Sequence, residues 1–163
     1  NELNKYNNFN YIVPVQYFLI KNNQEDIHNK CLEFMEMGYE GIMLRDVNNS
    51  YDFKRSDRLL KYKIFEENDF IISELLEGKK GTDFENSLGS FSCYGQLKYN
   101  NEIINVSFNA NFKGTDEERK LLWKQKDTLI GKKIEVKYQG VSQDKNGNYS
   151  LRFPVATKIK FDR

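Results

Sequence analysis

Histidine, proline, tryptophan and cysteine are all scarce: the 163 residues include one His, two Pro, one Trp and two Cys. The two cysteines, Cys31 and Cys93, form no Cys-x-x-Cys pair, which excludes a disulfide-rich scaffold and argues against a zinc site. We expect both to be small core residues. The single histidine, His28, lies off the apolar face of a predicted helix, so we expect a surface residue and not a catalytic base.

Long apolar runs are also missing. No stretch of about 18 apolar residues exists, and the first residues lack the charged-then-apolar layout of a signal peptide. We therefore expect an intracellular protein, in the cytoplasm, a nucleus or a virus factory, that is neither secreted nor bound to a membrane. With 39% hydrophobic and 30% charged residues, the composition is that of a globular protein with one ordinary domain or two small ones.

Charge is unevenly distributed, although the net charge is only +1. Residues 132–163 carry eight basic and three acidic side chains, a local charge of +5. This excess predicts a basic surface that binds a polyanion. Its first three lysines, Lys132, Lys133 and Lys137, are our candidates for that contact.

The first 65 residues alternate strand and helix patterns. Residues 11–20 are β-branched and aromatic and predict a strand, with Pro14 at an edge or bulge. A helix capped by Asn23 follows, and Gly38 ends it; its apolar face is formed by Ile27, Cys31, Phe34 and Met35. Residues 40–45 and 59–63 predict two further strands, with a polar turn at 48–50.

The charged patch at 65–69 is the predicted boundary, because the pattern then changes to five strands. We place these strands at 70–76, 88–98, 103–112, 133–139 and 149–161. A helix that begins with the capping box Thr115-x-x-Glu118 and ends at Gly131 separates the third strand from the fourth. This order is typical of the OB-fold barrel. The strand count alone also fits an SH3-like barrel. The predicted class is α+β.

Three charged residues, Lys61, Lys63 and Glu40, are candidates for binding a phosphate or a metal ion. On a strand, Lys61 and Lys63 point to one face, where two ammonium groups repel unless an anion such as a phosphate lies between them. A basic surface strand is the plainer explanation. Glu40 precedes a short apolar strand, where it can bind a metal or pair with these lysines.

The last segment, residues 150–163, alternates charged and apolar side chains. In a strand, this pattern buries Ile159 and Phe161 and directs Lys158, Lys160 and Asp162 to the other face. Taken alone, the segment predicts a charged edge strand, which is a common protection against aggregation.

Taken together, three segments resemble motifs IV, V and VI of ATP-dependent DNA ligases, especially the compact enzymes of viruses and phages. They read E-G-I-M-L-R (40–45), Y-D-F-K-R-S-D-R-L-L-K-Y-K (51–63) and R-F-P-V-A-T-K-I-K-F-D-R (152–163). The resemblance extends over nearly the whole chain and implies the end of a nucleotidyltransferase (adenylation) domain at 1–65 and an OB domain at 66–163. It also implies ATP and Mg²⁺ or Mn²⁺ as cofactors, nicked duplex DNA as substrate and a monomer.

The resemblance assigns roles in the first two motifs. Glu40 matches the carboxylate that binds the divalent metal, and Arg45 matches a basic residue that faces the nucleotide. Strand alternation places these two side chains on opposite faces, so one of them must lie beyond a strand end or a bulge. Lys61 and Lys63 match the lysines that contact the α-phosphate and stabilise the charge that develops there.

In the third motif, the resemblance implies a segment that closes over the ATP site and orients the pyrophosphate. Arg152 begins it, and Lys158, Lys160, Asp162 and Arg163 extend it. Many relatives carry arginine where this chain has Lys158 and Lys160, which removes the bidentate fork but keeps the charge. Lys132, Lys133 and Lys137 then become the candidate DNA-binding residues.

The nucleophile of the family is the lysine of a K-x-D-G motif, and this sequence contains no K-x-D-G. We therefore expect the chain to be the C-terminal part of a ligase that does not adenylate itself. Two alternatives stay open. One is an RNA capping or RNA-ligase-type nucleotidyltransferase. The other is a non-catalytic OB module whose aromatic residues stack on nucleic-acid bases.

Overall fold

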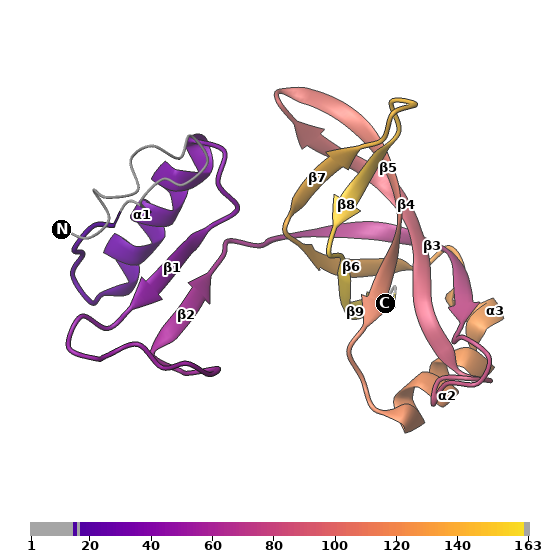
Figure 1. The fold of residues 1–163 in the computed structure, drawn as a ribbon. Helices are drawn as coiled ribbons and strands as arrows, with labels where there is room; N and C mark the ends of the chain where they lie inside the picture. The colour runs from indigo at the N-terminus through magenta and orange to yellow at the C-terminus, as the bar shows by residue number, and fades with distance from the viewer. Residues whose placement is uncertain (1–14, 16, 162–163) are drawn as a thin grey trace. The chain divides into compact units, whose positions relative to one another are not determined.

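The computed structural model describes residue 15 and residues 17–161. The chain divides into two compact units, residues 1–62 and 63–163 (Figure 1). This division lies close to the charged patch at 65–69 that the sequence marks as a boundary. Each unit is described by itself below.

The described part of the first unit contains one helix and a two-stranded antiparallel sheet: α1 (Gln24–Glu36), β1 (Ile42–Arg45) and β2 (Leu59–Tyr62). The predicted cap of α1 is confirmed, because Asn23 Oδ1 accepts a hydrogen bond from the Asp26 amide at 2.8 Å. Gly38 follows the helix with φ +90°, a conformation that favours glycine. The predicted strand at 11–20 is wrong for residues 15 and 17–20, which form no strand, while 11–14 (with Pro14) and 16 lie outside the described residues.

Little of this unit is buried. Among its described residues, Cys31 is the one hydrophobic side chain that is buried. Several large side chains are instead exposed, among them Met43 (52%), Tyr51 (57%) and Phe53 (98%). A helix and two short strands hide too little apolar surface to offset the entropy of ordering the chain.

The second unit is mostly β-structure with two short helices. Its helices are α2 (Asp116–Lys124) and α3 (Lys126–Leu129). Its strands are β3 (Glu66–Glu77), β4 (Leu88–Tyr99), β5 (Glu102–Phe112), β6 (Lys133–Tyr138), β7 (Gly140–Gln143), β8 (Tyr149–Arg152) and β9 (Val155–Lys160). The predicted capping box of α2 is present, because Thr115 and Glu118 bond each other's backbone amides at 2.7 and 3.3 Å.

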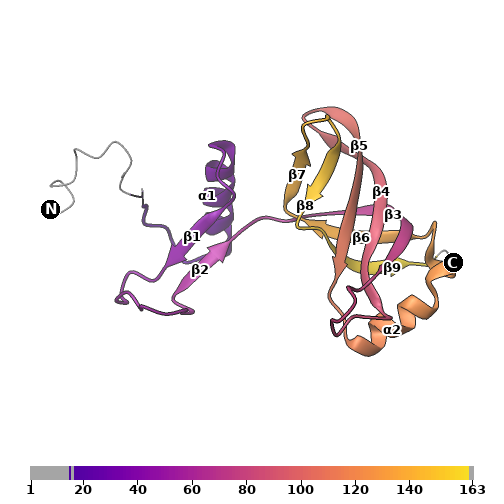
Figure 2. The same cartoon turned by 45° about the vertical axis from the view of Figure 1, so that its right-hand side comes forward.

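Five of the strands close into a barrel. The neighbours run β3–β4–β5–β9–β6 and back to β3, and the β5–β9 pair is parallel. This order, with the helices inserted between the third and fourth barrel strands, is that of an OB-fold, and the prediction is confirmed. Figures 1 and 2 show α2 at one end of the barrel and the β7–β8 hairpin at the other.

A single apolar core fills the barrel. Strict alternation builds it: in β5, Ile104, Val106, Phe108 and Ala110 are buried and the residues between them are exposed. The rest of the core comes from Phe70, Ile72, Leu75, Leu88, Phe91, Cys93, Leu97, Leu129, Ile134, Val136, Tyr138, Leu151 and Ala156. Burial raises the pKa of the Cys93 thiol to about 12, which fits the predicted role of a core residue.

The C-terminal segment differs from the prediction of one strand at 149–161. It forms β8 and β9, separated by Phe153 and Pro154, because Phe153 adopts φ +52° and leaves the strand conformation. β8 pairs with β7, a strand that the sequence did not predict. Ile159 packs against the core as expected, but Phe161 is 65% exposed, so its predicted burial is wrong.

Candidate functional site

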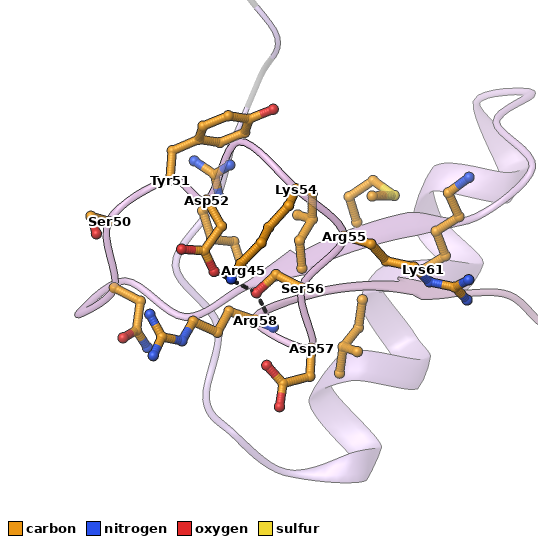
Figure 3. A pocket seen from close by; sticks show the side chains of 14 residues that line it. Arg45, Ser50, Tyr51, Asp52, Lys54, Arg55, Ser56, Asp57, Arg58 and Lys61 are labelled. Carbon is orange, nitrogen blue, oxygen red and sulfur yellow. Dashed lines mark hydrogen bonds between the residues drawn. The ribbon is translucent and has the colours of Figure 1, made fainter.

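A hollow of about 720 Å³ lies between β1, β2 and the connecting loop 46–58 (Figure 3). Its lining is strongly cationic: five basic side chains meet two carboxylates, Asp52 and Asp57. The basic side chains are those of Arg45, Lys54, Arg55, Arg58 and Lys61. We call this feature the cationic hollow. An excess of positive charge in a concave surface favours an anionic ligand.

Hydrogen bonds shape the loop around the hollow. Asp52 Oδ2 accepts a hydrogen bond from Ser56 Oγ at 2.7 Å, and Ser56 Oγ accepts one from the Arg58 amide at 3.2 Å (Figure 3). Across the loop, the guanidinium of Arg45 lies 5.2 Å from the ring centre of Tyr51, within cation–π range. Contacts within the loop and to β1 therefore fix the backbone that bears Lys54, Arg55 and Arg58.

Two predicted nucleotide ligands, Arg45 and Lys61, line the hollow together. Arg45 pairs with Leu59 and Met43 pairs with Lys61, so strand alternation places both basic side chains on one face of the sheet. Glu40 precedes β1, which begins at Ile42. The predicted conflict between Arg45 and Glu40 is thereby resolved, since Glu40 lies outside the strand. Glu40 is exposed and does not line the hollow.

Lys63 lies outside β2 and does not line the hollow. β2 ends at Tyr62, and Lys63 is the first residue of the second unit. Its Nζ donates a hydrogen bond to Gln139 Oε1 at 3.4 Å and lies 6.0 Å from the ring centre of Phe153. The strand predicted at 59–63 therefore ends one residue earlier than expected, and Lys63 lies beyond its end.

The outer surface of β3, β6 and β9 gathers most of the other predicted cations. We call it the charged face. Lys133 lies directly opposite Lys160, and Glu135 lies opposite Lys158. The remaining members are Glu67, Asp69 and Lys137 on β3 and β6. The structure thus brings residues predicted for DNA binding and residues predicted for ATP binding to the same face, while Lys132 precedes β6 and is half-buried.

Carboxylates neutralise part of this face. Lys160 Nζ lies 2.6 Å from Asp69 and 3.6 Å from Glu135, and the hydrogen bond to Asp69 raises the pKa of Lys160. Lys137 Nζ lies 3.1 Å from Glu67. The charge of +5 counted along the sequence therefore overstates the positive charge of this surface, because acidic residues of β3 lie beside it.

A β-bulge sets the orientation of these lysines. Glu135 pairs with Lys158 and Val136 pairs with Ala156, so Thr157 is an extra residue on β9. Thr157 Oγ1 donates hydrogen bonds to Glu135 O at 3.1 Å and Glu135 Oε1 at 3.0 Å. Thr157 and Lys158 are consequently both exposed.

Phe153 is a candidate functional residue that sequence reasoning missed. It is 63% exposed and has φ +52°, a conformation that costs energy in a bulky residue. The guanidinium of Arg152 lies 5.9 Å from its ring centre, and Lys63 lies on the ring as well. The sequence did contain a signal for this residue, because Phe153 comes directly before Pro154. A residue before proline avoids the helical region of the backbone and is either extended or strained.

Comparison with known proteins identifies the relatives. A DNA ligase of African swine fever virus (isolate Tick/South Africa/Pretoriuskop Pr4/1996) is 35% identical over 77 residues, which is 45% of this chain and 18% of that protein. The DNA ligase of the isolate Warthog/Namibia/Wart80/1980 is 34% identical over the same length. Over that segment the chain is similar to DNA ligases. It spans 18% of the length of the curated relatives it matches. No protein-family model matches it.

Solved structures agree with this relationship. The structure named Pmar-Lig_PreS3 matches 83% of the ligase-related chain and 30% of its own chain, with a TM-score of 0.70 and 26% identity. A Lig E DNA ligase matches 87% of this chain and 48% of its own, with a TM-score of 0.64 and 23% identity, which supports the fold. The resemblance to the C-terminal part of ATP-dependent DNA ligases is thus confirmed.

Within residue 15 and residues 17–161, no helix is long and apolar enough to cross a bilayer. The same part of the chain holds no group of three or more His, Cys, Asp or Glu side chains arranged to bind a metal ion.

Proposed function

We propose that this chain is the C-terminal part of an ATP-dependent DNA ligase, with the end of the adenylation domain in residues 1–65 and the OB domain in residues 66–163. The observation that carries the proposal is the cationic hollow of motifs IV and V, followed along the chain by a closed OB barrel. Relatives named DNA ligase support the same assignment.

The cationic hollow is the proposed nucleotide-facing surface. Arg45 and Lys61 face the phosphates from the sheet, and the loop adds Lys54, Arg55 and Arg58. Positive groups fixed before the reaction stabilise the charge that develops on a transferred phosphoryl group. The family resemblance also gives Lys63, which does not line the hollow, a contact to the α-phosphate.

Glu40 would hold the divalent metal. A single carboxylate fits Mg²⁺, which commonly keeps several waters and is completed by substrate phosphates. Mn²⁺ prefers the same oxygen donors. The bound ion would neutralise phosphate charge.

The proposed reaction has three nucleotidyl transfers. AMP passes from ATP to a lysine that lies outside this sequence, with loss of pyrophosphate. It then passes to the 5′-phosphate of a nick. The 3′-hydroxyl finally attacks that phosphate and displaces AMP. Arg152, Lys158 and Lys160 orient the pyrophosphate in the first step, for which Lys160 exchanges its Asp69 partner for a phosphate oxygen.

The barrel contributes the grip on the duplex. Lys132, Lys133 and Lys137 contact backbone phosphates in this proposal, so affinity falls as salt rises. Contacts to phosphate carry little sequence information, which suits an enzyme that must seal nicks anywhere.

The test uses the protein that contains this chain together with the residues encoded upstream. Labelled ATP reports formation of enzyme-AMP, and a nicked duplex reports sealing. Lys61→Ala and Glu40→Ala are expected to lower sealing by about a hundredfold or more. Lys145→Ala, in the exposed β7–β8 turn, is the matched control and keeps full activity. Wild-type sealing by Lys61→Ala would contradict the proposed role of the hollow.

A second function, a nucleic-acid-binding module without catalysis, is favoured by two observations. The barrel has a complete core of its own, and Phe153 exposes an aromatic ring between two cations. ATP with magnesium distinguishes the two functions. A ligase fragment binds ATP through the hollow, and Lys61→Ala weakens that binding. A module that only stacks on bases binds nucleic acid equally well with or without ATP and magnesium.

A further inference from the structure

The break between β8 and β9 carries an exposed aromatic ring. Phe153 is 63% exposed and has φ +52°, so it gains neither the free energy of full burial nor an easy backbone conformation. Its neighbour Pro154 is buried, and the Pro154 carbonyl accepts a hydrogen bond from the Asn111 amide at 2.9 Å. The backbone is thus fixed on the barrel while the ring stays exposed. Strained residues of this kind are found most often at functional sites.

Two cations lie close to this ring. The guanidinium carbon of Arg152 is 5.9 Å from the ring centre, and Lys63 Nζ is 6.0 Å from it. Both distances are within the range at which the quadrupole of the ring attracts a cation. Arg152 belongs to β8, whereas Lys63 is the first residue of the second unit. The ring therefore joins residues from opposite ends of this unit's sequence.

Gln139 contacts the same two residues. It is the single residue between β6 and β7, and its amide donates a hydrogen bond to the Arg152 carbonyl at 3.0 Å. Its side-chain Oε1 accepts a hydrogen bond from Lys63 Nζ at 3.4 Å. Tyr138, directly before Gln139, is fully buried in the core, so Gln139 has a fixed base. We call Lys63, Gln139, Arg152 and Phe153 the ring cluster.

The chemistry of the ring cluster selects an anion. The phenyl ring and the carboxamide fix the positions of the two cations without cancelling their charge, because both groups are neutral. Two positive groups beside one ring repel each other, and an anion that contacts both of them relieves this repulsion. A ligand with several linked anionic groups can contact both cations at once.

The triphosphate of ATP is such a ligand. In the proposed function, on which this inference rests, Lys63 contacts the α-phosphate and Arg152 orients the pyrophosphate. The ring cluster brings these two side chains to one aromatic ring. One phosphate chain can therefore reach both.

We propose that Phe153 and Gln139 are positioning residues, which hold Lys63 and Arg152 in the arrangement that the triphosphate of ATP requires. Phe153 acts through its ring and Gln139 through its carbonyl oxygen, and neither touches the nucleotide. Because both cations are attached to the second unit, they meet the phosphate chain together. Side chains that are already held in place lose less entropy when they bind a ligand, which strengthens the contact.

The first test uses the protein that contains this chain together with the residues encoded upstream, and follows enzyme-AMP formation at increasing concentrations of labelled ATP. Phe153→Leu removes the ring but keeps an apolar side chain, and should lower kcat/KM for ATP about five- to tenfold. Phe153→Tyr keeps the ring and should retain the wild-type value. Gln139→Leu should lower kcat/KM about threefold. Tyr94→Leu, at a half-exposed aromatic residue of β4, is the control and keeps the wild-type value.

A second comparison shows whether Phe153 acts through the cations. In a protein that carries Arg152→Met, the further change Phe153→Leu should lower kcat/KM by no more than about twofold, because the ring then holds only one cation. A ring that stacks directly on a base would instead cost the same with or without Arg152.

The third test studies the 163-residue chain itself by NMR, with inorganic tripolyphosphate as the probe. In the wild-type chain, the ring current of Phe153 should shift the ε-methylene protons of Lys63, and tripolyphosphate should perturb the Nε–H resonance of Arg152. Phe153→Leu should abolish the ring-current shift and raise the Kd for tripolyphosphate about fivefold. Thermal unfolding of each variant verifies the fold.

Three outcomes overturn the inference and leave the proposed function standing. They are a wild-type kcat/KM in Phe153→Leu, an equal loss in Phe153→Tyr, and an undiminished effect of Phe153→Leu beside Arg152→Met. A wild-type protein that forms no enzyme-AMP overturns the proposed function instead. Binding of tripolyphosphate that Phe153→Leu weakens would in that case still support the ring cluster as a polyphosphate site.

Discussion

The two units of the chain differ most in what they bury. The barrel unit has a core of seventeen buried side chains, whereas the described part of the first unit has Cys31 alone. Yet the cationic hollow, the feature most suited to a nucleotide, belongs to the first unit. In the proposed function, the nucleotide therefore binds to the unit that buries less apolar surface, and the barrel unit supplies the surface that binds DNA.

The largest expected effect comes from separating the units. Residues 63–163 should unfold cooperatively on heating, because the barrel closes on its own core. Residues 1–62 should show no cooperative transition, since two strands and one helix bury too little apolar surface. Circular dichroism and calorimetry measure both fragments. A cooperative transition in 1–62 would remove the contrast between the units.

Core truncation sharpens the same contrast. Phe91 is fully buried and packs edge-to-face on Phe112 with ring centres 6.1 Å apart. Phe91→Ala should lower the free energy of unfolding by about 3–5 kcal/mol. Met43→Ala, at an exposed position in the first unit, should change it by less than about 0.5 kcal/mol. Urea unfolding of the whole chain compares the two variants, and equal effects would contradict the difference in burial.

Arg119 tests a polar part of the barrel. Its guanidinium is buried and donates to the carbonyls of Leu88 (2.6 Å), Gly89 (3.2 Å) and Phe112. Arg119→Met leaves these carbonyls without their donor and should cost about 2–4 kcal/mol. Lys120→Met, the exposed neighbour on α2, should be near neutral. If both variants unfold at the same urea concentration, the hydrogen bonds of Arg119 do not stabilise the barrel.

The smallest effect is expected at the β7–β8 turn. Hydrogen bonds from the side chain and backbone of Asn148 lower the pKa of Asp144 below its usual value of 3.8. The carboxylate therefore stabilises the turn above pH 3.8, and this contribution disappears as the pH falls through the lower, folded-state pKa. The amide resonance of Asn148 should titrate with a midpoint below 3.8, and a midpoint at or above that value would show that the turn does not hold the carboxylate.

Local signals in the sequence predicted much of the fold. Asn23 and the Thr115–Glu118 capping box placed both main helices, and strict alternation placed the barrel strands. The β7–β8 hairpin was missed although Asn146–Gly147 is a recognised hairpin signal. The break at Phe153 was missed although the residue precedes Pro154, a position where the backbone is either extended or strained.

The candidate site was less predictable, because it depends on pairings between distant residues. Lys160 meets Asp69, which lies 91 positions earlier in the chain, so no local pattern reveals that this cation is neutralised. Arg45 and Lys61 were named from motifs, but the loop cations Arg55 and Arg58 were not, since their common position depends on the folded loop. The division between Lys61 and Lys63 depends on where β2 stops.

The extra residue at Thr157 acts as a phase shift in β9. If Thr157 were paired regularly instead of bulging, the alternation that buries Ala156 would turn Lys158 toward the core and Ile159 toward solvent. The bulge thus exchanges which side chains of β9 after Thr157 face the core and which face the solvent. Straightening the bulge with Thr157 kept would place an ammonium where the barrel now holds an isoleucine, whereas deleting Thr157 would remove the bulge and leave Ile159 facing inward.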